Sequence, residues 1–478
     1  MVRECRGRGP ARPRAIWRGP AASQRGHWPW SSRRAAAPLI QHRSPDYRRE
    51  GVTPPGLTPI LPTVFAMRRF LAVLLAAPLA LAAQQPAADP PTLARALALL
   101  KTDNAWTLQK QVALCEIPAP PFKEQARGVA FRSELVALGY AAARIDEVGN
   151  VVAEVQGVSQ GPTVLITGHL DTVFPEGTDV KVRQDGARLK GPGIGDDCRG
   201  LAVVLATARA VKQARLRFAG RVIFVANVGE EGPGNLLGTR HLLGTSYKGQ
   251  VDYFISVDGA GANIVSRAVG SNRYSVRFLS PGGHSYGAFG MPNPIHAMGR
   301  AIAAISDIQV PRSPKATFNV GIVSGGTSVN SIAMEAVMDV DMRSESAQEL
   351  AKLDVQVRKA IGDAVAAEKA RYPGSSKNLT VRIDTIGIRP TGAQSDDAPI
   401  VRAARLAARQ LGLTPSIGAS STDSNYPISL GIPAITIDGG GEGGGAHSHD
   451  EWYEDGPAGY LGPQWALRII ATLAGVAP

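Results

Sequence analysis

The sequence predicts an α/β fold in which a mostly parallel sheet, covered by helices, carries an inserted smaller α+β domain. From Ala143 to Asp258, short apolar runs typical of strands alternate with stretches of helical spacing. Such alternation favours a parallel sheet with helices on its faces. After Val269 the order changes to strand, helix, strand, strand, helix, strand, which describes one compact α+β unit.

The larger domain is predicted in two parts, residues 84–268 and 387–478, on either side of the insertion at 269–386. Apolar residues at helical spacing predict two or three helices between residues 92 and 140, with a break at the proline-rich segment 117–122. The expected strands of this domain are 143–155, 163–168, 221–228, 251–258 and 433–438. Its further helices are expected at 200–214, 235–243, 397–411 and the C-terminal segment. In the insertion the expected strands are 272–280, 317–325, 335–344 and 378–386, and the helices are 293–306 and 346–370.

The positive net charge is concentrated at the N-terminus. The chain carries +12, but residues 1–66 contain twelve basic and three acidic residues and so account for +9 of it. We therefore expect no basic surface on the body of the protein and no nucleic-acid partner. Residues 1–66 lack any helical or strand period, as expected of a disordered basic extension or of sequence translated from a misplaced start.

Residues 67–83 are typical of a secretory signal peptide. A basic region at 67–69 precedes a short apolar stretch, and residues 80–82 offer small side chains for cleavage. The apolar stretch is shorter than the ~20 residues that a transmembrane helix needs, so no stable membrane anchor is expected. We expect export to the periplasm or the extracellular space after cleavage near Ala82 or Ala83.

Cysteine usage excludes a disulfide scaffold for the exported chain. Only Cys115 and Cys198 follow the predicted cleavage site. A single disulfide between them remains an alternative to two free thiols.

Five acidic or histidine-containing motifs occur in order along the larger domain. They are GHLDTV at 168–173, GIGDD at 193–197, GEEG at 229–232, SVDG at 256–259 and AHSHDE at 446–451. The first four follow or close apolar runs or lie in a glycine-rich turn, so their polar groups would emerge at strand ends, where α/β sheets place their chemistry. Bridging carboxylates combined with imidazoles suit a pair of divalent ions better than one structural zinc.

These motifs resemble those of the co-catalytic two-zinc metallopeptidases and deacylases, which include peptidase T, carboxypeptidase G, acetylornithine deacetylase and succinyl-diaminopimelate desuccinylase. The resemblance covers residues 92–475. It implies two divalent metal ions, most readily zinc, with cobalt or manganese as alternatives. It also implies that the inserted domain acts as a lid and dimerisation surface, and hence a homodimer.

The resemblance assigns five metal ligands, which are His169, Asp196, Glu231, Asp258 and His447. Asp196 would bridge the ions, with His169 and Asp258 on one and Glu231 and His447 on the other. Taken singly, several motifs have simpler explanations, such as a helix cap for Asp258. His449 competes with His447, which is preferred because the family's histidine lies four residues before a glutamate, here Glu451.

The resemblance also assigns catalytic roles around these ligands. Glu230 would be the general base that takes a proton from a metal-bridged water, and Asp171 would orient the imidazole of His169. Asp197 is expected to be structural, and family members often have a cis peptide bond after the bridging aspartate. The sequence departs from the family after Asp197, where Cys198 and Arg199 occupy positions at which lysine is common, so Arg199 is a candidate to replace that cation.

Substrate contacts are expected from both domains. The resemblance points to His284, Asn330 and Arg343 in the insertion, and to Ser421, Thr422 and Asp423 in a serine-rich turn of the larger domain. Two simpler explanations remain open: His284 as a surface turn residue, and Arg343 as an ion-pair partner of Asp341 or Glu335.

The resulting prediction is a secreted zinc-dependent exopeptidase, of aminopeptidase or di- or tripeptidase type, that hydrolyses amide bonds of short peptides. Peptidase T-like character depends mainly on Asp258. The alternative enzyme is an N-acyl-amino-acid deacylase or carboxypeptidase, because the same centre cleaves any suitably placed amide. A non-enzymatic alternative is a nucleic-acid-binding protein that uses its arginine-rich arm and retains a vestigial zinc site.

Overall fold

The computed structural model describes residues 89–478. The basic extension predicted at 1–66 and the signal peptide predicted at 67–83 lie outside the described residues. Within the described part, no helix combines the length and apolar character needed to cross a membrane. The predicted fold class is confirmed, with a mostly parallel central sheet between helices and a second, smaller α+β sheet.

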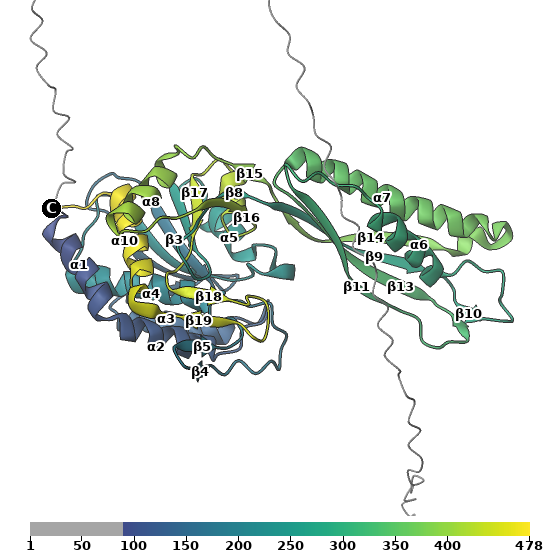
Figure 1. Cartoon of the computed structure of the whole chain (residues 1–478), viewed down its shortest axis with the longest axis horizontal. Helices are drawn as coiled ribbons and strands as arrows, with labels where there is room; N and C mark the ends of the chain where they lie inside the picture. Colours follow the sequence, from purple (N-terminus) through teal and green to yellow (C-terminus); the bar gives the residue numbers. More distant parts are fainter. Residues whose placement is uncertain (1–88) are drawn as a thin grey trace, which may run out of the picture. The chain divides into compact units, whose positions relative to one another are not determined.

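A nine-stranded sheet forms the centre of the larger domain (Figure 1). Its order is β1-β2-β6-β3-β7-β17-β8-β15, with β16 also paired to β8. The neighbours β6, β3, β7 and β17 run parallel, and antiparallel strands flank them. The bounds are β1 (Arg144–Ile145), β2 (Val151–Val155), β3 (Val164–His169), β6 (Val222–Asn227), β7 (Tyr253–Val257), β8 (Ile264–Ala268), β15 (Gly392–Ala393), β16 (Ile417–Ser420) and β17 (Ala434–Ile437).

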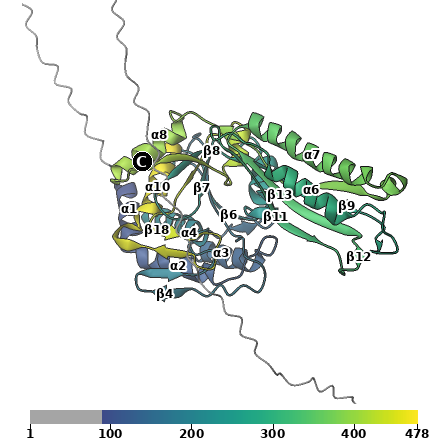
Figure 2. The same cartoon turned by 45° about the vertical axis from the view of Figure 1, so that its right-hand side comes forward.

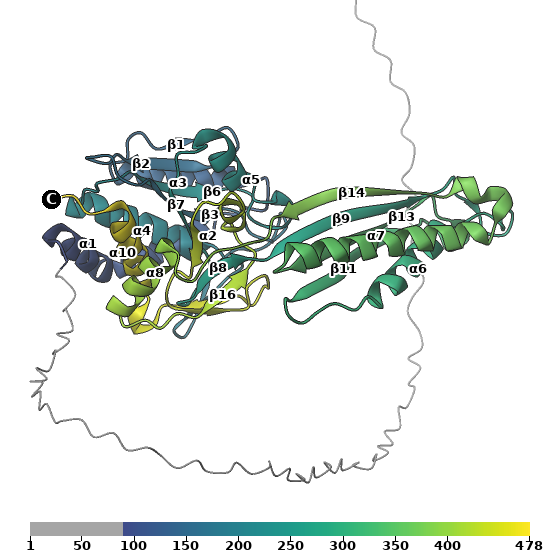
Figure 3. The same ribbon diagram turned by 90° about the horizontal axis from the view of Figure 1, so that it is seen from above.

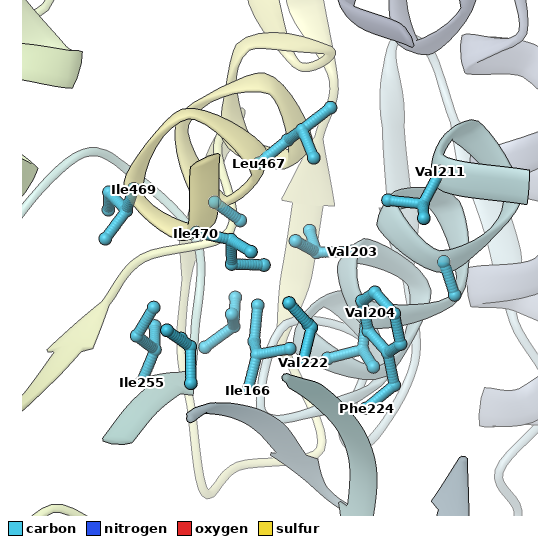
Figure 4. Close-up of a cluster of buried hydrophobic side chains, with 14 of the residues drawn as sticks. Ile166, Val203, Val204, Val211, Val222, Phe224, Ile255, Leu467, Ile469 and Ile470 are labelled. Atoms are coloured by element: carbon cyan, nitrogen blue, oxygen red, sulfur yellow. The ribbon is translucent and has the colours of Figure 1, made fainter. Parts of the chain in front are cut away.

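Side-chain alternation along the parallel strands gives the sheet a buried core on each face. On β3, Ile166 belongs to the larger core and Leu165 to the smaller one. Figure 4 shows part of the larger core, where side chains of the sheet, such as Ile166 and Phe224, gather with side chains of α4, such as Val204, and of α10, such as Ile470. Continuous burial on both faces fixes the strand ends and therefore the positions of the polar residues that follow them.

Six helices contribute to the larger core, among them the three found in the region where two or three were predicted. They are α1 (Pro91–Thr102), α2 (Asn104–Cys115), α3 (Gln125–Ala137), α4 (Cys198–Ala214), α8 (Pro399–Gln410) and α10 (Leu461–Ala474). The smaller core on the opposite face includes side chains of a π-helical turn (Leu242–Ser246) and of α9 (Asn425–Ser429), and α5 (Leu237–His241) directly precedes the π-helical turn. Short 3-10 turns lie at Gly232–Gly234, Pro373–Asn378 and Gly456–Ala458.

A small antiparallel sheet, which the sequence did not predict, supports the loop after the last glycine run. Its order is β18-β19-β5-β4, and the strands are β4 (Arg183–Asp185), β5 (Arg188–Lys190), β18 (Glu442–Gly444) and β19 (Trp452–Glu454). Strands of three residues are too short to show a readable period. The loop between β18 and β19 carries the last histidine motif.

The inserted sheet has the order β11-β13-β9-β14, and Figures 2 and 3 show α6 and α7 along one of its faces. Every second residue of β13 is buried against these helices. The elements are β9 (Gly270–Leu279), α6 (Pro294–Ser306), β11 (Ala316–Gly325), β13 (Glu335–Ser344), α7 (Ala347–Ala370) and β14 (Thr380–Arg389), and a separate pair joins β10 (Gly283–His284) to β12 (Ser331–Ile332).

The last strand of the insertion continues beyond its predicted end at residue 386. After an irregularity between Thr385 and Gly387, β14 goes on pairing with β9 as far as Arg389. This extension matters for the site, because it brings the side chain of Arg389 to the catalytic motif.

Candidate metal centre

The polar motifs lie together at the carboxyl ends of the parallel strands. His169 is the last residue of β3, and Asp258 directly follows β7. Glu231 lies in the loop after β6, and Asp196 lies in the turn before α4. His447 comes from the loop between β18 and β19. The structure thus brings together all five residues assigned as ligands.

Helix α4 begins unusually close to the strands, which places Asp196 beside them. A Cβ atom at Gly200 would lie 2.2 Å from the carbonyl oxygen of Val257, and one at Gly168 would lie 2.8 Å from the carbonyl carbon of Gly200. Neither position has room for a side chain. Glycine at both is therefore a packing requirement of the site.

Asp196 lies at the centre of the donor set. One of its oxygens, Oδ1, is 3.0 Å from Nε2 of His169, and the other, Oδ2, is 3.1 Å from Nε2 of His447. Nε2 of His169 is 3.9 Å from Oδ1 of Asp258, while Nε2 of His447 is 2.9 Å from Oε1 of Glu231. The donors therefore divide into two sets that share one carboxylate.

These separations fit a pair of cations. Metal–ligand bonds of about 2.0–2.1 Å in a tetrahedral site place neighbouring ligand atoms about 3.3 Å apart. The donor separations of 2.9–3.9 Å bracket that value. A bridging carboxylate with a separate histidine and acid on each side is a donor set for two divalent ions.

The electrostatics of the site also favour cations. Burial raises the pKa of Asp258 to about 8, and the neighbouring charge of Asp196 adds to this. Hydrogen bonds to Asp196 and Glu231 raise the pKa of His447 to about 10. Burial lowers the pKa of His169, but hydrogen bonds to Asp171 and Asp196 outweigh it and the net direction is upward. Positive charge would therefore stabilise the ionised form of these crowded carboxylates, and divalent ions can supply it.

His447 is held in a backbone conformation that a histidine rarely adopts. Its φ is 65°, in the left-handed region, which costs a residue with a Cβ about 1–2 kcal/mol. Such local strain is concentrated at functional sites, where the surrounding structure maintains it. His449, the competing candidate, instead packs its ring against Phe174 with the ring centroids 5.5 Å apart.

Asp171 contacts both the imidazole of His169 and the GEEG motif. Nδ1 of His169 contacts the backbone carbonyl of Asp171 at 3.0 Å, whereas the nearer carboxylate oxygen is 3.6 Å away. The carboxylate accepts hydrogen bonds from the backbone N–H groups of Glu230 at 3.0 Å and Glu231 at 2.8 Å. The carbonyl contact favours the tautomer that leaves Nε2 of His169 free to bind a metal, and the carboxylate fixes the GEEG motif.

Asp197 occupies the structural position expected for it. Its carboxylate accepts hydrogen bonds from the backbone N–H groups of His169 at 2.8 Å and Gly200 at 2.9 Å, and so caps α4. The peptide bond between Asp196 and Asp197 is cis, as the resemblance implied.

Glu451 is a supporting residue to which the sequence reasoning gave no role of its own. Its side chain is 1% exposed, and its carboxylate accepts 2.8 Å hydrogen bonds from the backbone N–H groups of Gly193, Gly195 and Asp196. The turn that carries the central aspartate is therefore held from the C-terminal part of the chain. The available signal was its place four residues after His447.

Glu230 is buried beside the ligands and paired with an arginine that the sequence reasoning missed. Nη1 of Arg389 donates to Oε1 of Glu230 at 2.9 Å and to Oγ of Ser421 at 3.1 Å. Burial raises the pKa of Glu230 well above its ordinary value, against the opposing charge of Arg389 and with the support of Glu231. A buried carboxylate of raised pKa beside a metal centre is suited to accept and pass on a proton.

The residues expected to contact substrate from the larger domain are mostly enclosed. Asp423 is fully buried and accepts hydrogen bonds from Asn227 at 2.7 Å and Thr239 at 2.6 Å. The Oγ1 of Thr422 lies 2.7 Å from that of Thr436. Since their polar atoms are used internally, Thr422 and Asp423 act as supports of the site, contrary to the prediction. Ser421 is less buried and contacts Arg389.

The three candidates from the insertion are more exposed. Nδ1 of His284 accepts from the backbone N–H groups of the following turn, and Oδ1 of Asn330 accepts from Ser328. Nε of Arg343 donates to Asp341 at 2.8 Å, which is the ion pair left open by the sequence. Within residues 89–478, none of the three hydrogen-bonds to a metal donor, so their substrate roles remain predictions.

Arg199 does not take the place of the lysine that is common in the family after the acidic pair. It is fully buried and donates to the backbone carbonyls of Gly439 at 2.8 Å and Gly459 at 2.7 Å, and its guanidinium lies over the ring of Tyr453. These contacts satisfy it as a structural residue. Cys115 and Cys198 are both buried free thiols, which decides against the disulfide alternative.

Known proteins share both the sequence pattern and the fold. The model for Peptidase family M20/M25/M40 matches residues 165–461. Carboxypeptidase G2 of Pseudomonas sp. (strain RS-16) is 27% identical over 232 residues, which are 46% of this chain and 54% of that relative. The structure of aminopeptidase PepT from Bacillus cereus ATCC 10987 matches with a TM-score of 0.59 at 21% identity, over 77% of this chain and 98% of that one.

A further match is the YXEP protein of Bacillus subtilis, described as a dinuclear metal-binding peptidase from the M20 family. It has a TM-score of 0.54 at 18% identity, and the match covers 79% of this chain and all of that one. At such identities the solved structures support the fold, while the family match rests on the sequence.

Proposed function

The chain belongs to peptidase family M20/M25/M40 and is a metal-dependent peptide hydrolase, and from this premise we propose that it is an exported two-metal exopeptidase acting on short peptides. The observation that carries the proposal is the convergence of five donors into two sets that share Asp196. Glu230, the proposed general base, directly precedes the donor Glu231 in the sequence.

The roles of the side chains follow from their contacts. Two divalent ions, zinc by preference, would supply Lewis acidity for the scissile carbonyl and the attacking water. Arg389 occupies Oε1 of Glu230, which leaves Oε2 to take the proton of that water. The oxygen of the water forms a bond to the carbonyl carbon. Glu230 then passes the proton to the amine nitrogen, and the carbon–nitrogen bond breaks to release the amine.

Three finer proposals have separate support. Export is supported by the signal-peptide pattern at 67–83. Zinc is supported by the two histidines among the donors, although cobalt and manganese fit the same ligand types. A homodimer is supported by β11, an edge strand of the inserted sheet whose Ile322 and Val323 are 61% and 56% exposed.

A substrate panel tests the proposal. Protein begun at Gln84 and loaded with zinc is supplied with di- and tripeptides, with the same peptides blocked at either end, and with N-acyl amino acids. Cleavage that requires a free terminus supports an exopeptidase, and the blocked end that abolishes turnover tells aminopeptidase from carboxypeptidase. Preference for N-acyl amino acids would replace the proposal by the deacylase alternative. Absence of metal-dependent turnover on all of them would overturn it.

A further inference from the structure

The loop that carries the catalytic glutamate is bonded to two strands of the inserted domain. We call residues 229–235 the base loop. At the end of β14, Arg389 donates Nη1 to the carboxylate of Glu230 at 2.9 Å and Nη2 to the backbone carbonyl of the same residue. On β9, Arg273 donates Nη1 to the backbone carbonyl of Gly232 at 2.8 Å. The backbone N–H of Ile388 donates to Oδ1 of Asn235 at 3.0 Å.

The larger domain holds the same loop through its N–H groups. Asp171 accepts from Glu230 and Glu231, and Glu124 accepts from Gly229 at 3.2 Å. The base loop is therefore fixed on one side by carboxylates of the larger domain and on the other by arginines of the insertion. Movement of the inserted strands would act on the carbonyl side of the loop and on the carboxylate of Glu230.

The ion pair between Arg389 and Glu230 is buried. The two residues are 3% and 4% exposed, so neither charge can be solvated freely. The guanidinium is planar and uses two nitrogens on one residue, one for the carboxylate and one for the carbonyl. This geometry fixes both the backbone and the rotamer of Glu230, which a lysine could not do in the same way.

A second chain of contacts links the base loop to the substrate side of the insertion. Nε of Arg273 donates to one oxygen of Asp341 at 2.8 Å, and Nε of Arg343 donates to the other oxygen at 2.8 Å. Arg343 is 40% exposed and is a predicted substrate contact. An anionic substrate group that engages Arg343 would thus compete with Asp341 for Arg343. Asp341 also pairs with Arg273, which holds the base loop.

We propose that Arg389 is a positioning residue for Glu230 and that, together with Arg273, it makes the placement of the base loop depend on the inserted domain. This inference rests on the proposed role of Glu230 as general base. Neither arginine contacts a metal donor in the described part of the chain, so their removal should affect turnover without removing metal.

The test compares Arg389→Ala, Arg389→Lys and Arg273→Ala with two control variants. Arg382→Ala is the control on β14, since Arg382 pairs with Asp384, and Arg277→Ala is the control on β9, since Arg277 pairs with Glu335. Each zinc-loaded protein is assayed for kcat and KM on the best peptide of the panel, with bound metal and thermal unfolding measured beside them.

We expect Arg389→Ala to lower kcat about 100-fold, with KM within threefold and two metals retained, because a displacement of about 1 Å at a catalytic group has that effect. Guanidinium ion at millimolar concentration should restore part of the lost kcat. Arg389→Lys should retain more activity than the alanine variant, Arg273→Ala should show a smaller loss, and both controls should stay within twofold of the parent.

Glu230→Gln separates this inference from the proposed function. Adding Arg389→Ala to Glu230→Gln should cause no further loss, because residues that act as a unit are not additive. An Arg389→Ala enzyme with normal kcat, a loss explained by lost metal, or a loss additive with Glu230→Gln would overturn the positioning role. If Arg389→Ala does not fold, the test relies on Arg389→Lys. A normal kcat in Arg389→Lys, unchanged by added guanidinium, would then overturn the positioning role. A fully active Glu230→Gln enzyme would instead contradict the proposed function.

Discussion

The support that Glu451 gives to the central aspartate can be tested by a single isosteric change. Its carboxylate accepts hydrogen bonds from Gly193 through Oε2 and from Gly195 and Asp196 through Oε1, each at 2.8 Å. In Glu451→Gln, one oxygen can still accept two of these bonds, but the new amide group faces the third N–H as a donor.

The magnitude follows from these three bonds. Loss of one charge-assisted hydrogen bond costs about 1.5–3 kcal/mol, and a neutral acceptor weakens the other two by about 0.5 kcal/mol each. We therefore expect a decrease of about 3 kcal/mol in the free energy of unfolding. Because one of the lost or weakened bonds orients Asp196, we also expect metal affinity to fall about 10–100-fold.

Urea unfolding of the metal-free protein and competitive zinc titration measure the two effects. Burial raises the pKa of Glu451 to about 7, so both are done at pH 8.5, where the carboxylate is ionised. Glu454→Gln is the matched control, because Glu454 lies on the neighbouring strand and pairs with the partly exposed Arg188. A decrease below 1 kcal/mol with unchanged zinc affinity would show that Glu451 does not support the turn at Asp196.

Three further predictions follow from the contacts of the site and its surroundings. His447→Ala should reduce bound zinc from two ions to one per chain while His449→Ala retains both, as measured by mass spectrometry of the metal; equal losses would contradict the ligand choice. Asp171→Asn should lower kcat about 10–100-fold because one N–H of the GEEG motif loses its acceptor, and normal kinetics would show that this support is dispensable. Burial raises the pKa of Asp438 to about 6, so the stability gained from its protonated form is present below pH 4 and is lost as the pH rises through 6. Asp438→Asn should accordingly gain about 3 kcal/mol relative to the parent between pH 4 and pH 7 in urea unfolding, and a difference that is constant with pH would contradict this.

The fold could be predicted from the sequence because its strands are buried on both faces. Runs such as the one around Ile166 are continuously apolar, and the residues that follow them are polar because the strands end at an open edge. His169 and Asp258 come directly at these strand ends, whereas Asp196, Glu231 and His447 lie in turns and loops. Short-range pattern and family resemblance were both needed to group the five.

The contacts that support the site depend on pairings between distant segments. Glu451 reaches the turn at Asp196 from 255 residues away in the sequence, and Arg389 reaches Glu230 from 159 residues away. Nothing in the local sequence marks such a partner. Arg389 was also placed beyond the predicted end of its strand, because the irregularity at Thr385 and Gly387 interrupts the period that defined the strand.

Residue type alone predicts a functional role at some positions where burial points to a structural one. Arg199 follows the acidic pair and suggested a cation for the site, but backbone carbonyls surround its guanidinium. Thr422 and Asp423 lie in a turn that suggested substrate contact, but each polar side chain has an internal partner. The exposure of a side chain decides between a functional and a structural role. In irregular segments the sequence has no period from which exposure can be predicted.

We propose that two metal ions held around Asp196 work with Glu230 as the general base to hydrolyse a peptide bond. The most direct test measures zinc content and peptide turnover together for the parent and for Glu230→Gln. We expect two zinc ions per chain in both proteins, with kcat in the variant lower by at least about 1,000-fold. Turnover that survives in Glu230→Gln, or a parent enzyme that works fully with its metal removed, would contradict it.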